Sequence, residues 1–254
     1  MNVLVMNLTR LGDLLQSQPA IAGLAAQGHR ISLACLENFA PAAALMQGVD
    51  AVLPFPGARI LSRLDANWRQ ALAAHQEALA AARGEHPPDV VINLTPSEPA
   101  RLLAMGLKPG EVRGFALDEY GFNADSGSWA AFLLLASTTR GASPFNIVDL
   151  FRRIAGLSGA PGGNGGNDDN GGFGLRGPTA QEKSAALATV HELCPQAATS
   201  RGLVALQLGA SEERRRWPVA YFAQLATRLA AEGYTPVLLG TQSERCLLYT
   251  SRRG

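Results

Sequence analysis

Asp13 is the residue near the amino terminus that is best placed to do chemistry. It ends the run Asn7-Leu8-Thr9-Arg10-Leu11-Gly12-Asp13, which follows strand-like residues 3–6 and precedes a helix-like segment. Open α/β sheets hold their ligands at the carboxyl ends of the strands. The order of elements therefore predicts a carboxylate at a ligand site, and the alternative is an aspartate that only caps the helix from Leu14 onward.

The residues around Asp13 extend this prediction. Gly12 is expected to let the backbone turn sharply between strand and helix. Thr9 and Arg10 lie in the same turn and suit contacts to a phosphate or carboxylate, although Arg10 is equally compatible with a solvated loop. Asn93-Leu94-Thr95 repeats the pattern Asn7-Leu8-Thr9 after another strand-like run, so Asn93 is predicted to face the same ligand.

A second set of candidate functional residues is the run Arg214-Arg215-Arg216, which precedes Trp217-Pro218 and a helix-like segment. Proline suits the first turn of a helix, and a cationic loop that leads into a helix amino terminus binds anions. The run therefore predicts an anion site, and the alternative is a surface basic cluster. Ser211 beside it either donates a hydrogen bond to a phosphate or caps the turn, whereas Trp217 is expected to pack.

The elements that position these residues alternate along the chain. Strand-like runs occur at residues 3–6, 31–36, 51–55 and 90–94, with helix-like stretches between most of them. Such alternation predicts an α/β fold with a parallel sheet covered on both faces. The rhythm restarts later, with helices predicted at 179–193 and 219–231 and strands at 203–207 and 236–239.

A Gly- and Asn-rich stretch between these parts, centred on residues 161–172, predicts a linker because it cannot bury enough apolar surface to order itself. We therefore divide the chain into an amino-terminal α/β domain (1–157), a linker (158–178) and a second α/β domain (179–254). The second domain is shorter than the roughly 100 residues typical of a domain, so we expect it to be incomplete.

Composition excludes several other functions. Lys and Arg total 22 against 21 for Asp and Glu, so no basic field indicates a nucleic-acid partner. No signal peptide or membrane span is evident, which predicts a cytoplasmic protein. The three cysteines and four histidines lack ligand spacing, so no metal site is expected. The absence of GxGxxG, Walker and GxSxG motifs argues against dehydrogenases, NTPases and hydrolases and gives no sign of a cofactor.

The motif ending in Asp13, followed one domain later by Leu208-Gly209-Ala210-Ser211-Glu212-Glu213-Arg214-Arg215-Arg216-Trp217-Pro218, resembles the family 9 glycosyltransferases, the ADP-heptose:lipopolysaccharide heptosyltransferases. The resemblance runs to about Glu244. It implies a GT-B fold of two Rossmann-like domains, with the acceptor held by the first domain and the nucleotide-sugar by the second. It also implies metal-independent transfer of a sugar, with inversion, from ADP-heptose to a lipopolysaccharide core, and hence peripheral contact with the inner membrane.

The same resemblance assigns roles to individual residues. Asp13 becomes the base that takes the proton of the acceptor hydroxyl. Arg215, where the family often has Lys, contacts the donor diphosphate with help from Arg214. Glu244 becomes a contact to the nucleotide ribose, and its alternative is an ordinary glutamate at the start of a helix.

The end of the chain departs from the family pattern. Further α/β units are expected after Glu244, but Arg245 to Gly254 does not match them, and part of it resembles translated sequencing-adapter sequence. The hypothesis is a gene truncated close to Arg245, with this polypeptide inactive or very weak. Two other functions remain open: a non-catalytic nucleotide-binding module, and a sugar-nucleotide epimerase of GT-B shape that acts without an acceptor.

Overall fold

A computed structural model describes residues 1–64, 66–84, 87–139, 141, 143–158, 174–210 and 213–240. The chain divides into two compact units, Met1–Gly177 and Pro178–Gly254. Ser211 and Glu244, two of the predicted site residues, lie outside the described residues. Each unit is an α/β structure with a parallel sheet, as the sequence predicts.

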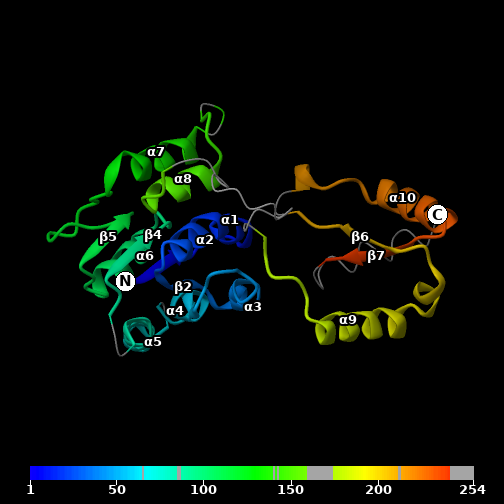
Figure 1. Cartoon of the computed structure of the whole chain (residues 1–254), viewed down its shortest axis with the longest axis horizontal. Helices are drawn as coiled ribbons and strands as arrows, with labels where there is room; N and C mark the ends of the chain where they lie inside the picture. Colours follow the sequence, from blue (N-terminus) through cyan, green and yellow to red (C-terminus); the bar gives the residue numbers. More distant parts are fainter. Residues whose placement is uncertain are drawn as a thin grey trace. The chain divides into compact units, whose positions relative to one another are not determined.

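The first unit is built on a five-stranded parallel sheet in the order β3-β2-β1-β4-β5 (Figure 1). Its strands are β1 (Asn2–Asn7), β2 (Arg30–Leu36), β3 (Ala51–Phe55), β4 (Val90–Asn93) and β5 (Glu111–Gly114). The chain moves from β1 through β2 to β3 on one side and then returns to β4 on the other side of β1. The carboxyl ends of β1 and β4 therefore form the topological switch point of the sheet, where open α/β sheets leave a crevice.

Alternating side chains of the strands build a core on each face of the sheet. Val3 and Val5 belong to one hydrophobic cluster, while Leu4 and Met6 belong to the other. The first face is covered by α1 (Leu11–Gln16), α2 (Gln18–Ala26), α3 (Ala40–Ala43), α7 (Gly127–Thr138) and α8 (Ile147–Ile154). The second face is covered by α5 (Trp68–Arg83) and α6 (Glu98–Gly106).

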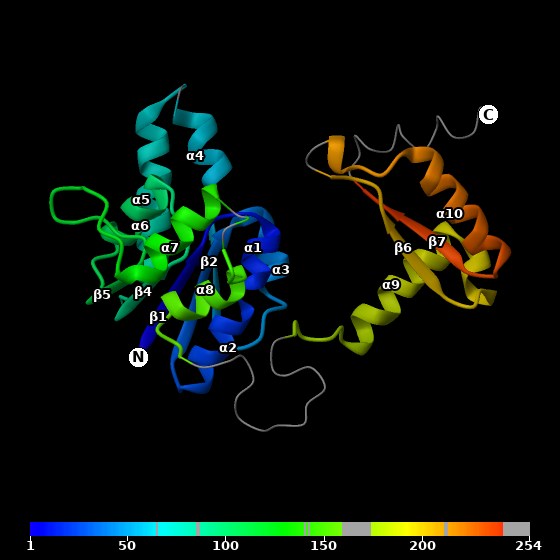
Figure 2. The same cartoon turned by 90° about the horizontal axis from the view of Figure 1, so that it is seen from above.

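One further helix, α4 (Gly57–Leu64), pairs with α5 to form a hairpin that projects past the sheet (Figure 2). The N-cap of α5 is Asn67, whose side chain accepts a hydrogen bond from the backbone N–H of Gln70 (3.3 Å). A short 3-10 turn, Glu37–Phe39, links β2 to α3.

The described residues of the second unit form two parallel strands, β6 (Leu203–Gln207) and β7 (Thr235–Leu239), and two helices, α9 (Ala180–Leu193) and α10 (Val219–Ala231). Short 3-10 turns occupy Pro195–Thr199 and Glu213–Arg215. A capping box starts α9, because the Thr179 hydroxyl accepts from Glu182 N and the Glu182 carboxylate accepts from Thr179 N. These bounds agree with the sequence-based prediction to within one residue at each end.

Candidate functional site

Two matching turns form the switch point of the first unit. In the Asn7 turn the side-chain Oδ1 accepts from Thr9 N (3.3 Å), and in the Asn93 turn it accepts from Thr95 N (3.0 Å). The Nδ2 group of Asn7 donates to the carbonyl of Asp13 (3.0 Å), and that of Asn93 donates to the carbonyl of Phe115 (2.8 Å). Each buried asparagine therefore folds its own turn, and Asn7 also holds α1 while Asn93 holds the residue that follows β5.

The two turns are also bonded to each other. Leu8 N donates to the Thr95 hydroxyl (2.8 Å), and Leu94 N donates to the carbonyl of Met6 (2.9 Å). Asn93 is buried and its amide is used on both sides by protein groups. The two triplets of the sequence repeat thus lie side by side at the carboxyl ends of β1 and β4. The Asn93 side chain, however, is bonded to protein groups, so its contacts are structural.

Asp13 lies in the first turn of α1, half-buried, directly after the Asn7 turn. The helix begins at Leu11 with Arg10 as its N-cap residue, so Asp13 is not the cap of a helix that starts at Leu14. Its position in the first turn suits a carboxylate, because the helix dipole favours negative charge there. The alternative interpretation of Asp13 as an N-cap is therefore wrong.

A cavity of about 410 Å³ opens beside Asp13. Its floor is formed by residues at the ends of β4 and β5, including Leu94 and Phe115, and its wall by apolar residues of α7 and α8. Among the described residues that line it, Asp13 carries the charge. A mostly apolar cavity with a few convergent polar groups is typical of a ligand site. The lining residues are Thr9, Asp13, Gln16, Leu94, Pro96, Phe115, Leu133, Leu134, Ala136, Ser137, Ser143, Phe145, Ile147, Leu150 and Phe151.

The other predicted site residues of the first motif differ in whether they line this cavity. Thr9 lines the cavity with Asp13, whereas Arg10 is exposed and does not line it. Gly12 is the second residue of α1, and an added Cβ would meet nothing within 4 Å. The expectation of a sharp glycine turn is wrong, because the Asn7 turn makes the change of direction before the helix begins.

Arg101 is a residue of this region that the sequence motifs did not reveal. It lies buried in α6, donates to the carbonyls of Pro96 (3.1 Å) and Ala116 (2.7 Å), and pairs with Asp125. Its guanidinium also stacks over the Phe115 ring at 5.0 Å. Since Pro96 and Phe115 line the cavity, Arg101 supports its floor. The signal available in the sequence was a single arginine inside the apolar run from Ala100 to Ala104.

In the second unit Arg214 and Arg215 end the 3-10 turn before α10, and Arg216 follows it. Arg214, Arg215 and Arg216 are exposed there, and Arg216 Nε donates to the carbonyl of Ala210 (3.2 Å). Pro218 is the N-cap of α10. A cationic turn thus leads into a helix amino terminus, which is the arrangement that favours an anion.

The Trp217 side chain is 46% exposed, and its ring centroid lies 4.9 Å from that of Phe222 in an edge-on arrangement. Both rings line a cavity of about 580 Å³ between α10 and the sheet of the second unit. Of the arginine run, Arg216 is the member that lines this cavity. Arg214 and Arg215, the two residues that the sequence selects, lie on the turn beside it.

Two further properties concern the described residues. They contain no group of three or more His, Cys, Asp or Glu side chains arranged to hold a metal ion. None of the helices found in them has the length and apolar character required to cross a bilayer.

Comparison with known proteins supports the resemblance seen in the sequence. The family model described as glycosyltransferase family 9 (heptosyltransferase) matches residues 170–251, a range that contains the arginine run. No curated protein sequence matches the chain significantly.

Solved structures match the fold of the chain, at identities too low to show more than the fold. A family 9 glycosyl transferase from Veillonella parvula matches with a TM-score of 0.72 and 16% identity over 98% of this chain and 65% of its own. E. coli ADP-heptose lps heptosyltransferase II matches with a TM-score of 0.64 and 17% identity, over 98% of this chain and 67% of its own. E. coli heptosyltransferase WaaC with ADP-2-deoxy-2-fluoro heptose matches with a TM-score of 0.61 and 18% identity, over 100% of this chain and 74% of its own.

The chain therefore spans less than two thirds of the length of the Veillonella structure. The fold is that of the GT-B heptosyltransferase structures, and the family model matches in the second unit. Together these matches confirm the resemblance of the chain to glycosyltransferase family 9.

Proposed function

We propose that this protein is an inverting glycosyltransferase that moves a sugar from a nucleotide diphosphate to a lipopolysaccharide-type acceptor. The observation that carries the proposal is the carboxylate of Asp13 in a cavity at the switch point, where an acceptor hydroxyl can reach it. In this proposal residues 1–157 bind the acceptor, residues 158–178 act as a linker, and residues 179–254 contribute to the site for the nucleotide-sugar.

The transfer step uses Asp13 as a general base. As the acceptor oxygen forms its bond to the anomeric carbon, Asp13 takes the hydroxyl proton. The bond from that carbon to the diphosphate breaks on the opposite face, so the configuration inverts and the electron pair leaves with the diphosphate. Arg215 and Arg214 neutralise the charge that develops on the leaving group, a task for which no metal ion is then required.

The remaining site residues have supporting roles. Thr9 lines the cavity beside Asp13 and is proposed to bind the acceptor, and Arg10 is proposed to bind an anionic group of it. Gly12 leaves open space next to Asp13. We propose that Asn93 acts by holding the floor of the cavity, and that Ser211 and Glu244 contact the phosphate and ribose of the donor.

We further propose ADP-heptose as the donor. The support is the family match of the second unit and the WaaC structures, one solved with ADP and another with ADP-2-deoxy-2-fluoro heptose. An acceptor anchored in a bilayer places the enzyme on the cytoplasmic side of the inner membrane as a peripheral protein.

The substitution Asp13→Asn tests the proposal. It keeps the shape of the side chain and removes the base, so acceptor-dependent ADP release from ADP-heptose should fall at least about 100-fold. Binding of ADP, measured by calorimetry on the 254-residue chain, should not change. Because the sequence predicts weak turnover by this chain, ADP release is measured on the longest polypeptide that the gene encodes.

Two results would contradict the proposal. Turnover that survives Asp13→Asn would remove the base from the mechanism. A protein that binds ADP and shows no acceptor-dependent release before any substitution would instead be a nucleotide-binding module. The matched control is Asp118→Asn, an aspartate of the same unit that does not line the cavity.

A further inference from the structure

We propose that the end of the α4–α5 hairpin is the surface by which this protein docks on an anionic lipid bilayer. The hairpin tip is defined here by Leu61 and Arg63 of α4 and by Trp68, Arg69 and Leu72 of α5. The inference deepens the proposed function, because an acceptor anchored in a membrane requires the enzyme to lie against that membrane.

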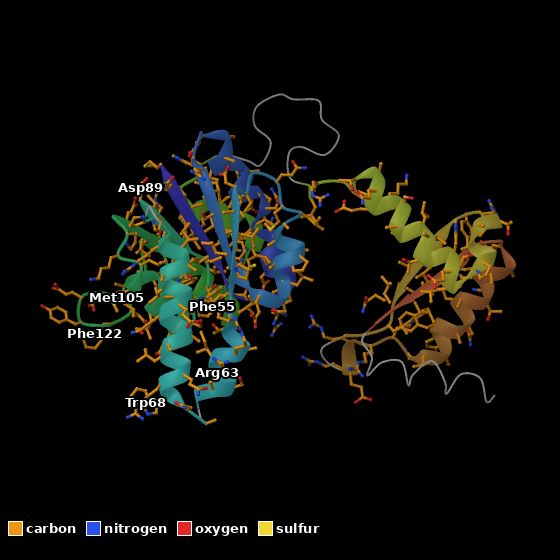
Figure 3. The ribbon with its side chains drawn as sticks, turned by 90° about the horizontal axis from the view of Figure 1, so that it is seen from below. Phe55, Arg63, Trp68, Asp89, Met105 and Phe122 are labelled. Atoms are coloured by element: carbon orange, nitrogen blue, oxygen red, sulfur yellow. The ribbon has the colours of Figure 1, made fainter. Side chains whose placement is uncertain are left out.

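The topology places the hairpin tip past the same edge of the sheet as Asp13. Pro56 alone separates the end of β3 from α4, and the helix starts with a hydrogen bond from Ile60 N to the Pro56 carbonyl (3.0 Å). α4 continues beyond the carboxyl ends of the strands, and α5 returns toward the start of β4 (Figure 2). In Figure 3 Trp68 and Asp89, which directly precedes β4, lie at opposite ends of the unit, with Phe55 at the end of β3 between them.

Large apolar side chains are exposed at this tip. Leu61 is 67% exposed, Trp68 56% and Leu72 48%. Ala71 and Ala74 of α5 are buried, and Leu79, two turns after Leu72 on the same face of the helix, packs on the second hydrophobic cluster. Trp68 and Leu72 continue this apolar face toward the hairpin end, where they stay exposed. Tryptophan and leucine are the residues that amphipathic surface helices insert at the boundary between headgroups and acyl chains.

Positive charge surrounds the apolar residues. Arg63 and Arg69 are exposed, and the Arg69 guanidinium lies 4.7 Å from the centroid of the Trp68 ring. Residues 57–72 contain three arginines and one aspartate, while the whole chain has a net charge of only +1. The third arginine, Arg59, is paired with Glu37 at 3.2 Å. An apolar tip flanked by arginines complements an anionic bilayer, which attracts basic residues held at its surface.

The shape of the tip favours a bilayer over a folded protein partner. The α4–α5 pair projects past the sheet (Figure 2), and Trp68 lies at its far end (Figure 3). The apolar residues of the tip can therefore enter the headgroup layer while the sheet stays outside it. The edge of the sheet that carries Asp13 would then face the membrane. An acceptor held in the bilayer by its lipid would reach the cavity without leaving the membrane.

Sedimentation of the 254-residue chain with phosphatidylcholine vesicles, with and without phosphatidylglycerol, tests this inference. We expect the chain to sediment with the anionic vesicles and to be released by salt, because screening weakens the attraction of the arginines. The double variant Leu61→Ser/Trp68→Ser should bind at least about tenfold more weakly, since each removed side chain loses its transfer into the apolar layer. The double variant Arg63→Glu/Arg69→Glu should lose affinity by more than about fivefold per arginine.

Matched controls come from the second unit. Leu193, at the end of α9, is 81% exposed, and Arg228 is an exposed arginine of α10. Leu193→Ser and Arg228→Glu should leave vesicle binding unchanged. Thermal unfolding of every variant should match that of the unsubstituted chain, because the substituted side chains are exposed.

A second measurement locates the contact. Brominated acyl chains should quench tryptophan fluorescence of the bound chain, and Trp68→Phe should abolish that quenching while vesicle binding remains. The inference fails if the chain does not bind anionic vesicles, if the controls lose as much affinity as the tip variants, or if quenching survives Trp68→Phe. Tip-dependent self-association without lipid would instead assign the surface to a second copy of the chain. Because the assay contains neither donor nor acceptor, its outcome is separate from that of the transfer assay.

Discussion

The chemistry proposed for this chain depends on where one carboxylate lies. The side-chain amide of Asn7 donates a hydrogen bond to the backbone carbonyl of Asp13. The residue also lines the cavity. The position of this residue after the first strand could be predicted from the sequence, and the structure adds the cavity beside it. The local reason is the Asn7 turn, which finishes the change of direction before α1 begins.

A different titratable residue, Cys35, illustrates how burial controls reactivity. It lies in β2 inside the first hydrophobic cluster, and burial raises the pKa of its thiol to about 11. The thiolate that alkylating reagents need is therefore scarce at neutral pH. We expect iodoacetamide at pH 8 to leave Cys35 unmodified in the native chain while the partly exposed Cys194 reacts.

Peptide mass spectrometry measures this difference. Unfolding the chain in urea should make Cys35 react as fast as Cys194, because the unfolded thiols share the same environment. Equal labelling of the two cysteines in the native chain would contradict the prediction.

At the scale of the elements, periodicity and position predicted most of the structure. The strands of the first unit were predicted to within one residue, except for β5, whose four residues, Glu111–Gly114, are too short a run to give a clear strand signal. β5 is an edge strand that pairs with β4, and its two charged side chains pair with each other, Arg113 Nε donating to Glu111 at 2.8 Å. This pairing lowers the pKa of Glu111.

The candidate site was predicted less completely. Asp13 and Thr9 were found because they follow a recognisable strand, and Arg101 was missed because its partners, Pro96, Ala116 and Asp125, meet it only after folding. Asn93 was recognised as part of a repeat, but the direction of its side chain depends on hydrogen bonds to Phe115 and Thr95 that no pattern specifies.

The end of β5 offers a test of how tightly the site is packed. Gly114 has φ +92°, and an added Cβ would lie 2.1 Å from the carbonyl oxygen of Asn93. We expect Gly114→Ala to destabilise the first unit severely, because the new atom would displace β5 from β4. The change in the free energy of unfolding is measured by urea denaturation.

Gly121 provides the control for this test. Its φ is +86°, similar to that of Gly114, but an added Cβ would meet nothing within 4 Å. Gly121→Ala should therefore cost about 1–2 kcal/mol from backbone strain alone. If both variants lost the same stability, close packing against β4 would not be the cause.

At the scale of the whole molecule, the two units differ in how much apolar surface they bury. Both hydrophobic clusters lie within the first unit, whereas α9 and α10 contain no buried residue and the described strands of the second unit have one buried side chain, Leu206. A small core gives little stability after the entropy cost of ordering the chain. The second unit should therefore open more readily than the first.

Hydrogen exchange followed by mass spectrometry checks this prediction. Backbone amides of β6 and β7 should exchange many times faster than those of β1 and β4, although both pairs are parallel strands joined by ladder hydrogen bonds. Addition of ADP should slow exchange in the second unit and leave β1 and β4 unchanged. Equal protection of the two sheets would show that the second unit is stabilised by contacts that its own core does not provide.

The mutual bonding of the two Asn-Leu-Thr turns has an evolutionary consequence. Leu8 N donates to the Thr95 hydroxyl and Leu94 N donates to the carbonyl of Met6, so the conformation of each turn depends on the other. Substitutions in one triplet should accordingly be tolerated only with compensating changes in the other. Among homologous sequences the two triplets should vary as a pair, even though 86 positions separate their first residues.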